Sequence, residues 1–81
     1  MKVEVRLFAR ARDAAGAERV TVELPKSARV GDLRATLAAQ FPRLAPLAPS
    51  LLVAVGNDYA GDQAVLGEES EIACFPPVSG G

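Results

Sequence analysis

Histidine and tryptophan are absent from this sequence, and it contains a single cysteine. Without histidine or a second cysteine, the chain has neither the ligands of a typical zinc site nor the base of a nucleophile–base pair. One cysteine cannot form an internal disulfide, which fits a reducing compartment. We therefore expect no metal site, no bound cofactor and no complete set of catalytic side chains in this chain.

Long apolar runs and clusters of one charge are also missing. No segment approaches the roughly 18 apolar residues of a membrane span, and the start, MKVEVRLFAR, lacks the apolar stretch of a signal peptide. Nine basic and ten acidic residues are scattered along the chain, so we expect no basic face for nucleic-acid phosphates. These absences predict a cytoplasmic protein that binds no membrane and no nucleic acid.

The chain is short, with 81 residues, which leaves room for one domain. A chain of this size buries only about 60% of its unfolded surface, so it needs a dense apolar core when no disulfide or metal stabilises it. Hydrophobic residues make up 49% of the sequence and aromatic residues only 5%. The core must therefore consist mainly of aliphatic side chains.

The first quarter of the sequence predicts a hairpin with a long connection. KVEVRL alternates apolar and charged residues, with Val3, Val5 and Leu7 on one face, as a half-buried strand does. RVTVEL repeats the pattern at residues 19–24. Between them, RARDAAG predicts a short helical turn that ends at Gly16, since glycine tolerates the left-handed conformation at a helix end.

A long helix is predicted next, over residues 30–40. Asp32 falls in its first turn, where a negative charge complements the exposed amide groups, and a proline at position 42 favours an end before it. Apolar residues recur there at three- and four-residue steps, the spacing of an amphipathic helix: Val30, Leu33, Leu37 and Phe41.

The last third predicts three more strands. SLLVAV at 50–55 precedes a Gly-Asn turn, a short strand is expected near residues 64–66, and EIACF at 71–75 alternates again. This order of strands and one long helix predicts an α+β fold of the ubiquitin-like β-grasp type. Its mixed sheet of about five strands packs on the helix, and the first and last strands pair in parallel at its centre.

The chain ends in FPPVSGG. A terminal Gly-Gly arises by chance in roughly one chain in 200, but here it follows a stiff Pro-Pro stem and a β-grasp pattern. We expect a β-grasp domain at residues 1–75 and an extended tail at residues 76–81. A tail without regular structure and without function is the alternative.

The whole chain resembles the small, sulfur-carrying subunits of molybdopterin synthases. The resemblance rests on four segments: VRLFARARDAAG, VGDLRATL, LLVAVGNDYA and FPPVSGG. It implies that an ATP-dependent, E1-like adenylating enzyme activates the carboxylate of Gly81, which then becomes a thiocarboxylate (1-thioglycine). The synthase large subunit, in a heterotetramer with two copies of each subunit, uses this sulfur on the pterin precursor.

The resemblance also implies roles for particular residues. Gly80 and Gly81 are the reactive end and lack a Cβ, so they can enter a narrow active site. Pro76 and Pro77 have a fixed φ and should hold the tail extended, which lowers the entropy lost on insertion. An outer surface formed by Phe8, Tyr59 and Phe75 is predicted to contact the partner, although Tyr59 could instead pack at the base of its loop.

Cys74 alternates onto the core face, so we expect it to act as a small buried hydrophobe and not as a sulfur relay. Other functions remain open for the whole chain. They are the sulfur carrier of thiamine synthesis, a protein modifier joined to lysines through Gly81, and a β-grasp interaction module with an inert tail.

Overall fold

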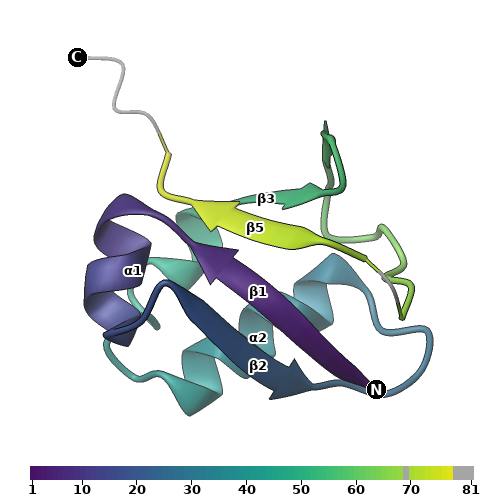
Figure 1. The fold of residues 1–81 in the computed structure, drawn as a ribbon, viewed down its shortest axis with the longest axis horizontal. Helices are drawn as coiled ribbons and strands as arrows, with labels where there is room; N and C mark the ends of the chain where they lie inside the picture. The colour runs from purple at the N-terminus through teal and green to yellow at the C-terminus, as the bar shows by residue number, and fades with distance from the viewer. Residues whose placement is uncertain (69, 78–81) are drawn as a thin grey trace.

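A single mixed sheet organises the computed structural model, which describes residues 1–68 and 70–77 (Figure 1). In these residues the strand order is β2-β1-β5-β3-β4. β1 and β5 pair in parallel at the centre, and the other neighbours are antiparallel. The strands are β1 (Lys2–Leu7), β2 (Arg19–Glu23), β3 (Leu52–Val55), β4 (Asp58–Tyr59) and β5 (Ile72–Phe75). The predicted β-grasp fold is confirmed.

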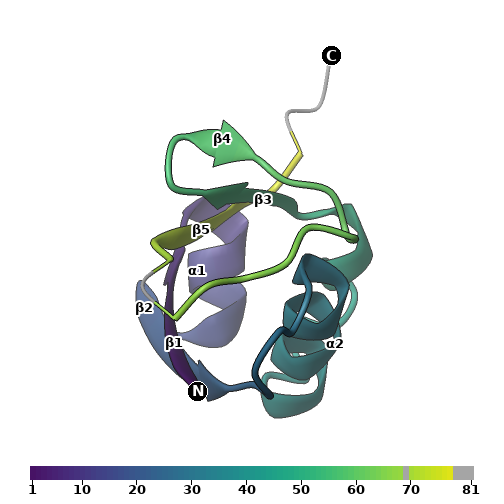
Figure 2. The ribbon, with the colours of Figure 1, turned by 90° about the vertical axis from the view of Figure 1, so that its right-hand side faces the viewer.

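Two α-helices lie on the same side of the sheet and leave its other side open (Figure 2). α2 (Val30–Gln40) has the predicted bounds. α1 (Ala9–Ala15) is a second helix where only a helical turn was expected, and it ends at Gly16, whose φ is 77°. A short 3₁₀ helix, η1 (Ala48–Ser50), leads into β3. Within the described part of the chain, no helix is long and apolar enough to cross a membrane.

The core fills the space between the sheet and the two helices. It is aliphatic, as the composition predicts, and the described residues bury no polar or charged side chain. Burying one such aliphatic side chain contributes roughly 1.5–3 kcal/mol relative to leaving it exposed. The largest fully buried side chains come from both layers and the connections between them: Leu7, Leu33, Leu37, Leu44, Ile72, Val5, Val22, Val30 and Cys74.

The start of α2 is covered by the segment between β4 and β5. The first helical amide groups need acceptors outside the helix, and the N–H groups of Val30 and Gly31 donate to the carbonyl oxygens of Ala64 (2.9 Å) and Asp62 (3.0 Å). The Asp32 carboxylate accepts a further bond, from the N–H of Arg29 at 2.8 Å. Asp32 therefore stabilises the helix start, as predicted.

The strand predicted at residues 64–66 is wrong. Val65 forms only an isolated bridge with Arg29, just before α2, and the short fourth strand of the sheet is β4 instead. The N–H of Leu66 donates to the Ala28 carbonyl at 2.8 Å, and the Leu66 side chain is buried. Its apolar character therefore reflects packing beside the start of α2, not membership of the sheet.

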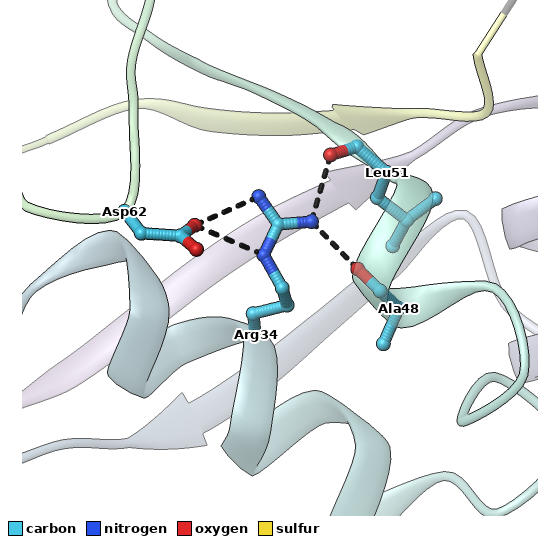
Figure 3. Close-up of polar contacts among 4 residues, drawn as sticks. All are labelled: Arg34, Ala48, Leu51 and Asp62. Atoms are coloured by element: carbon cyan, nitrogen blue, oxygen red, sulfur yellow. Dashed lines mark hydrogen bonds and ion pairs between the residues drawn. The ribbon is translucent and has the colours of Figure 1, made fainter.

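Arg34 joins three parts of the fold (Figure 3). Its side chain projects from α2 and is only 17% exposed. Nη1 donates to the carbonyl oxygens of Ala48 (2.6 Å) and Leu51 (2.8 Å), and Nε and Nη2 each lie 3.1 Å from Asp62 Oδ1. Arg34 thus connects α2 to η1, to the start of β3 and to the segment after β4.

Candidate functional site

Three aromatic side chains gather at the root of the C-terminal tail. β1 and β5 are neighbours, and the N–H of Phe8, directly after β1, donates to the carbonyl oxygen of Cys74 at 3.2 Å. This pairing stacks Phe8 on Phe75 with ring centroids 4.6 Å apart and planes 11° apart. Tyr59, from β4, meets Phe75 edge-on with centroids 6.5 Å apart. The three residues predicted to contact a partner therefore lie together.

Two further residues extend this surface, and sequence reasoning missed both. Leu52 pairs with Phe75 across β3 and β5 and is 40% exposed. The guanidinium carbon of Arg6 lies 5.3 Å from the centroid of Phe8, within the range of a cation–π interaction. Alternation could have identified Leu52, because its neighbours Leu51 and Val53 are buried. The same alternation along β1 puts Arg6 on the outer face, as it does Phe8 two residues later, so Arg6 could also have been identified.

We call Phe8, Leu52, Tyr59 and Phe75 the aromatic face. It lies on the open side of the sheet, and Tyr59 is 72% exposed there. Grouped apolar side chains on a small protein commonly mark a site of interaction. The stacked rings are already packed against one another, so little side-chain entropy would be lost when a partner covers them.

The chain leaves the sheet at this face. β5 ends at Phe75, and Pro76, half-buried, and Pro77, exposed, follow without regular secondary structure. Figure 1 shows the chain turning away from the sheet after β5. Gly80 and Gly81, the predicted reactive end, lie outside the described residues, and their roles stay predictions.

The family model for the ThiS family matches residues 5–81, which include the second half of β1, the aromatic face and the tail. This chain belongs to the ThiS family.

Curated relatives of this ThiS-family chain carry one functional name. The molybdopterin synthase sulfur carrier subunit of Arabidopsis thaliana is 31% identical over 81 residues, covering 100% of this chain and 84% of the relative. The Chlamydomonas reinhardtii protein of the same name is 34% identical over 83 residues, and both chains are covered completely. The likeness therefore spans the whole sequence, including its last residues.

A solved structure also resembles this ThiS-family fold. The crystal structure of SAMP1 from Haloferax volcanii superposes with a TM-score of 0.86 at 29% sequence identity, covering 100% of both chains. Related structures are described as small archaeal modifier proteins. The same β-grasp scaffold thus occurs under two functional names.

Cys74 is a core residue of this ThiS-family protein, as predicted. Its side chain is fully buried in β5. Burial disfavours the thiolate and raises the pKa of Cys74 to about 11, although the positive charge of Arg34 acts in the opposite direction. Because the thiolate is the reactive form of sulfur, this thiol is inert at neutral pH. The described residues also include no group of acidic, cysteine or histidine side chains that could hold a metal ion.

Proposed function

We propose that this chain is the sulfur-carrying small subunit of a molybdopterin synthase and that it carries sulfur as a thiocarboxylate at Gly81. The observation behind the proposal is the match along the entire chain to relatives that bear this name. The Gly-Gly end and the aromatic face at the root of the tail support it, since both suit a chain end that enters another protein.

The proposed chemistry begins with a poor electrophile. The Gly81 carboxylate attacks the α-phosphate of ATP on an E1-like adenylating enzyme, and pyrophosphate leaves. The acyl-adenylate then has a good leaving group, so a sulfur donor displaces AMP and gives the thiocarboxylate. Its sulfur is ionised at neutral pH and is more nucleophilic than oxygen. ATP is used by the activating enzyme and is not a cofactor of this chain.

Sulfur transfer requires a second protein. Since this sequence contains no histidine and its one thiol is buried, the groups that bind the pterin precursor and move protons come from the synthase large subunit. Phe8, Tyr59 and Phe75 bind that subunit, in a heterotetramer with two copies of each chain. Pro76 and Pro77 direct residues 76–81 into its active site, while residues 1–75 remain a folded domain.

The test follows the chain end by mass. Incubation with ATP, the adenylating enzyme and a sulfur donor should change the mass of the protein by one oxygen-to-sulfur exchange, located at Gly81. The loaded protein should then convert the pterin precursor when the large subunit is added. Deleting Gly81, or adding residues beyond it that stay uncleaved, should abolish loading without unfolding the domain. Normal product formation by the extended chain would rule the proposal out.

A protein modifier is the second candidate, and the likeness to the small archaeal modifier proteins favours it. Both functions begin with adenylation of the chain end, so adenylation alone does not separate them. Isopeptide-linked conjugates to lysines in cells would support the modifier. A pathway assay separates the third candidate, because a sulfur carrier of thiamine synthesis would restore thiazole formation and leave molybdopterin formation unchanged.

A further inference from the structure

Three arginines lie within seven residues of sequence, on either side of Phe8, where β1 passes into α1. Arg6 lies near the end of β1, and Arg10 and Arg12 lie in the first two turns of α1. All three are exposed. We call Arg6, Arg10 and Arg12 the arginine rim. The whole chain has one more acidic than basic residue, so the concentration of positive charge beside the tail is a local feature.

Ion pairs neutralise little of the positive charge of the arginine rim in the folded chain. Arg12 Nε lies 3.8 Å from Asp13 Oδ1, but both side chains are more than half exposed, so water screens this pair. Within residues 1–68 and 70–77, neither Arg6 nor Arg10 forms an ion pair. Arg6, whose guanidinium lies over the Phe8 ring, therefore carries an uncompensated charge beside the ring that stacks on Phe75, where β5 ends.

A small pocket lies within the rim. Its volume is about 70 Å³, and it is lined by Arg6, Leu7, Phe8, Arg12 and Glu18. A water molecule occupies about 30 Å³ of liquid, so the pocket has room for a carboxylate group. Two arginines are among its lining residues, and guanidinium is the side-chain group that best matches a carboxylate. Glu18 is the one acidic residue in the lining.

We propose that the arginine rim binds an acidic segment of the synthase large subunit, with one Asp or Glu side chain of that subunit in the pocket lined by Arg6 and Arg12. The proposal rests on the proposed function, because it concerns the same docking surface. The aromatic face supplies apolar contact, and the rim supplies long-range attraction and orientation. Attraction between opposite charges raises the rate of association and fixes the register of docking.

Glu18 allows the proposal to predict the direction in which a substitution changes the association rate. Glu18 is a lining residue of the same pocket, so its negative charge should repel an incoming acidic side chain and compete for the two arginines. Removing its charge should therefore accelerate association. A merely structural role for Glu18 would predict an unchanged or slower rate.

The experiment measures association with the purified synthase large subunit by stopped-flow fluorescence over a series of salt concentrations. Arg6→Gln/Arg12→Gln should slow association about tenfold at low salt, which is the lower end of the range for electrostatic steering. Glu18→Gln should accelerate it about two- to threefold. Both differences should shrink as added salt screens the charges. Circular dichroism checks that each variant is folded.

Lys26→Gln and Glu23→Gln are the matched controls. Both residues are exposed. Glu23 pairs with Lys2 at the start of β1 and Lys26 follows β2, so both lie at the end of the hairpin away from Phe8, and their variants should associate at the parental rate. Equal rates for the parent and the double variant at low salt would overturn the proposal, as would an equal loss in Lys26→Gln.

Sulfur transfer tests the proposed function separately from the association rates that test the arginine rim. If the parent transfers sulfur normally while the rim variants associate at the parental rate, the rim proposal fails alone. If the parent neither binds the large subunit nor takes up sulfur at Gly81, both fail.

Discussion

Ala9 has a backbone conformation that does not suit its side chain. Its φ is 53°, in the left-handed region, as is the φ of Ser27 at 65°. A Cβ in this region approaches the following carbonyl oxygen, which costs roughly 1–2 kcal/mol. Ala9 follows Phe8 directly, and it is here that the chain turns from β1 into α1. The strain is therefore located at the turn that positions the aromatic face.

Replacing Ala9 by glycine should remove this strain. Glycine also makes the unfolded chain more flexible, at a cost of about 0.5–1 kcal/mol, so we expect Ala9→Gly to change the free energy of unfolding by less than about 1 kcal/mol, in the stabilising direction. Gly16→Ala is the reverse test, since Gly16 has a φ of 77° and open space where a Cβ would lie. It should destabilise by about 1 kcal/mol. Urea denaturation measures both, and a clear destabilisation by Ala9→Gly would contradict the account.

Cys74 predicts how stability depends on pH. Its folded pKa of about 11 lies above the ordinary value of 9.0 because burial disfavours the thiolate. The folded state therefore holds the proton more tightly than the unfolded state does. The resulting stability is complete below pH 9 and is lost as the pH rises toward and through 11, to a total of about 2–3 kcal/mol.

The measurement compares the parent with Cys74→Ala between about pH 8 and about pH 11. The variant should be about 1 kcal/mol less stable near neutral pH, because a small buried group is lost, and its stability should fall less steeply once the pH exceeds the ordinary thiol pKa of 9.0. Single-turnover sulfur transfer should continue while it stays folded. A large loss of transfer in the folded variant would assign Cys74 a part in the chemistry.

At the scale of elements, local sequence patterns predict those helices and strands whose position depends on contacts between residues close in sequence. α2 could be placed at residues 30–40 because its apolar spacing and Asp32 act within the helix itself. β5 could be assigned an inner and an outer face because alternation does not depend on the neighbouring strand. The segment at 64–66 was assigned wrongly, since its hydrogen bonds reach residues 28–30, more than thirty positions away.

The candidate site also has features that local patterns predict and features that depend on contacts between distant residues. Alternation put Phe75 on the outer face, but the stacking of Phe8 on Phe75 follows from the parallel pairing of β1 with β5, and local patterns do not place the two rings against each other. The pocket that Arg6 and Arg12 share was likewise not predicted, because it depends on how the chain turns from β1 into α1 and on Glu18, which lies outside both elements.

Removing the Arg34 guanidinium tests how strongly it holds α2, η1 and the segment after β4 together. Arg34→Met keeps much of the apolar stem but removes the Arg34 donor from the carbonyl oxygens of Ala48 and Leu51, and Ala48 keeps only the longer bond from the N–H of Leu51 at 3.4 Å. Hydrogen bonds from a charged donor contribute about 1.5–3 kcal/mol, so we expect unfolding to become easier by about 2–3 kcal/mol in thermal or urea denaturation. Arg12→Met is the control, because its ion pair with Asp13 is exposed and should contribute less than about 1 kcal/mol. Equal stability of the two variants would contradict this role of Arg34.

At the scale of the whole molecule, the sheet has one covered side and one open side. α1 and α2 cover the first (Figure 2), and the aromatic face lies on the second. Stability and docking are thereby separated, since the core residues point toward the helices and the proposed contacts point away from them. A substitution on the open side should weaken binding more than folding.

Phe75→Glu tests this separation. An aromatic anchor in an interface can contribute about 2 kcal/mol or more, so we expect at least a roughly thirtyfold rise in the Kd for the large subunit. The free variant should stay folded by circular dichroism, because Phe75 is only half-buried. Val65→Glu is the control, since Val65 is 58% exposed and lies outside the aromatic face. Unchanged affinity in calorimetry, or an unfolded Phe75→Glu, would contradict the assignment.

The parallel pairing of β1 with β5 also governs when the protein can fold. Val5 pairs with Ile72 and Leu7 with Cys74, so the centre of the sheet joins residues from opposite ends of the chain. A nascent polypeptide on the ribosome can form the β1–β2 hairpin and α2 early, but it cannot complete the sheet until β5 has been synthesised. The centre of the sheet is therefore completed only after β5 is available. The aromatic face, which needs both Phe8 and Phe75 in place, is formed only in chains whose synthesis has passed β5, so unfinished chains have no complete docking surface with which to occupy a partner.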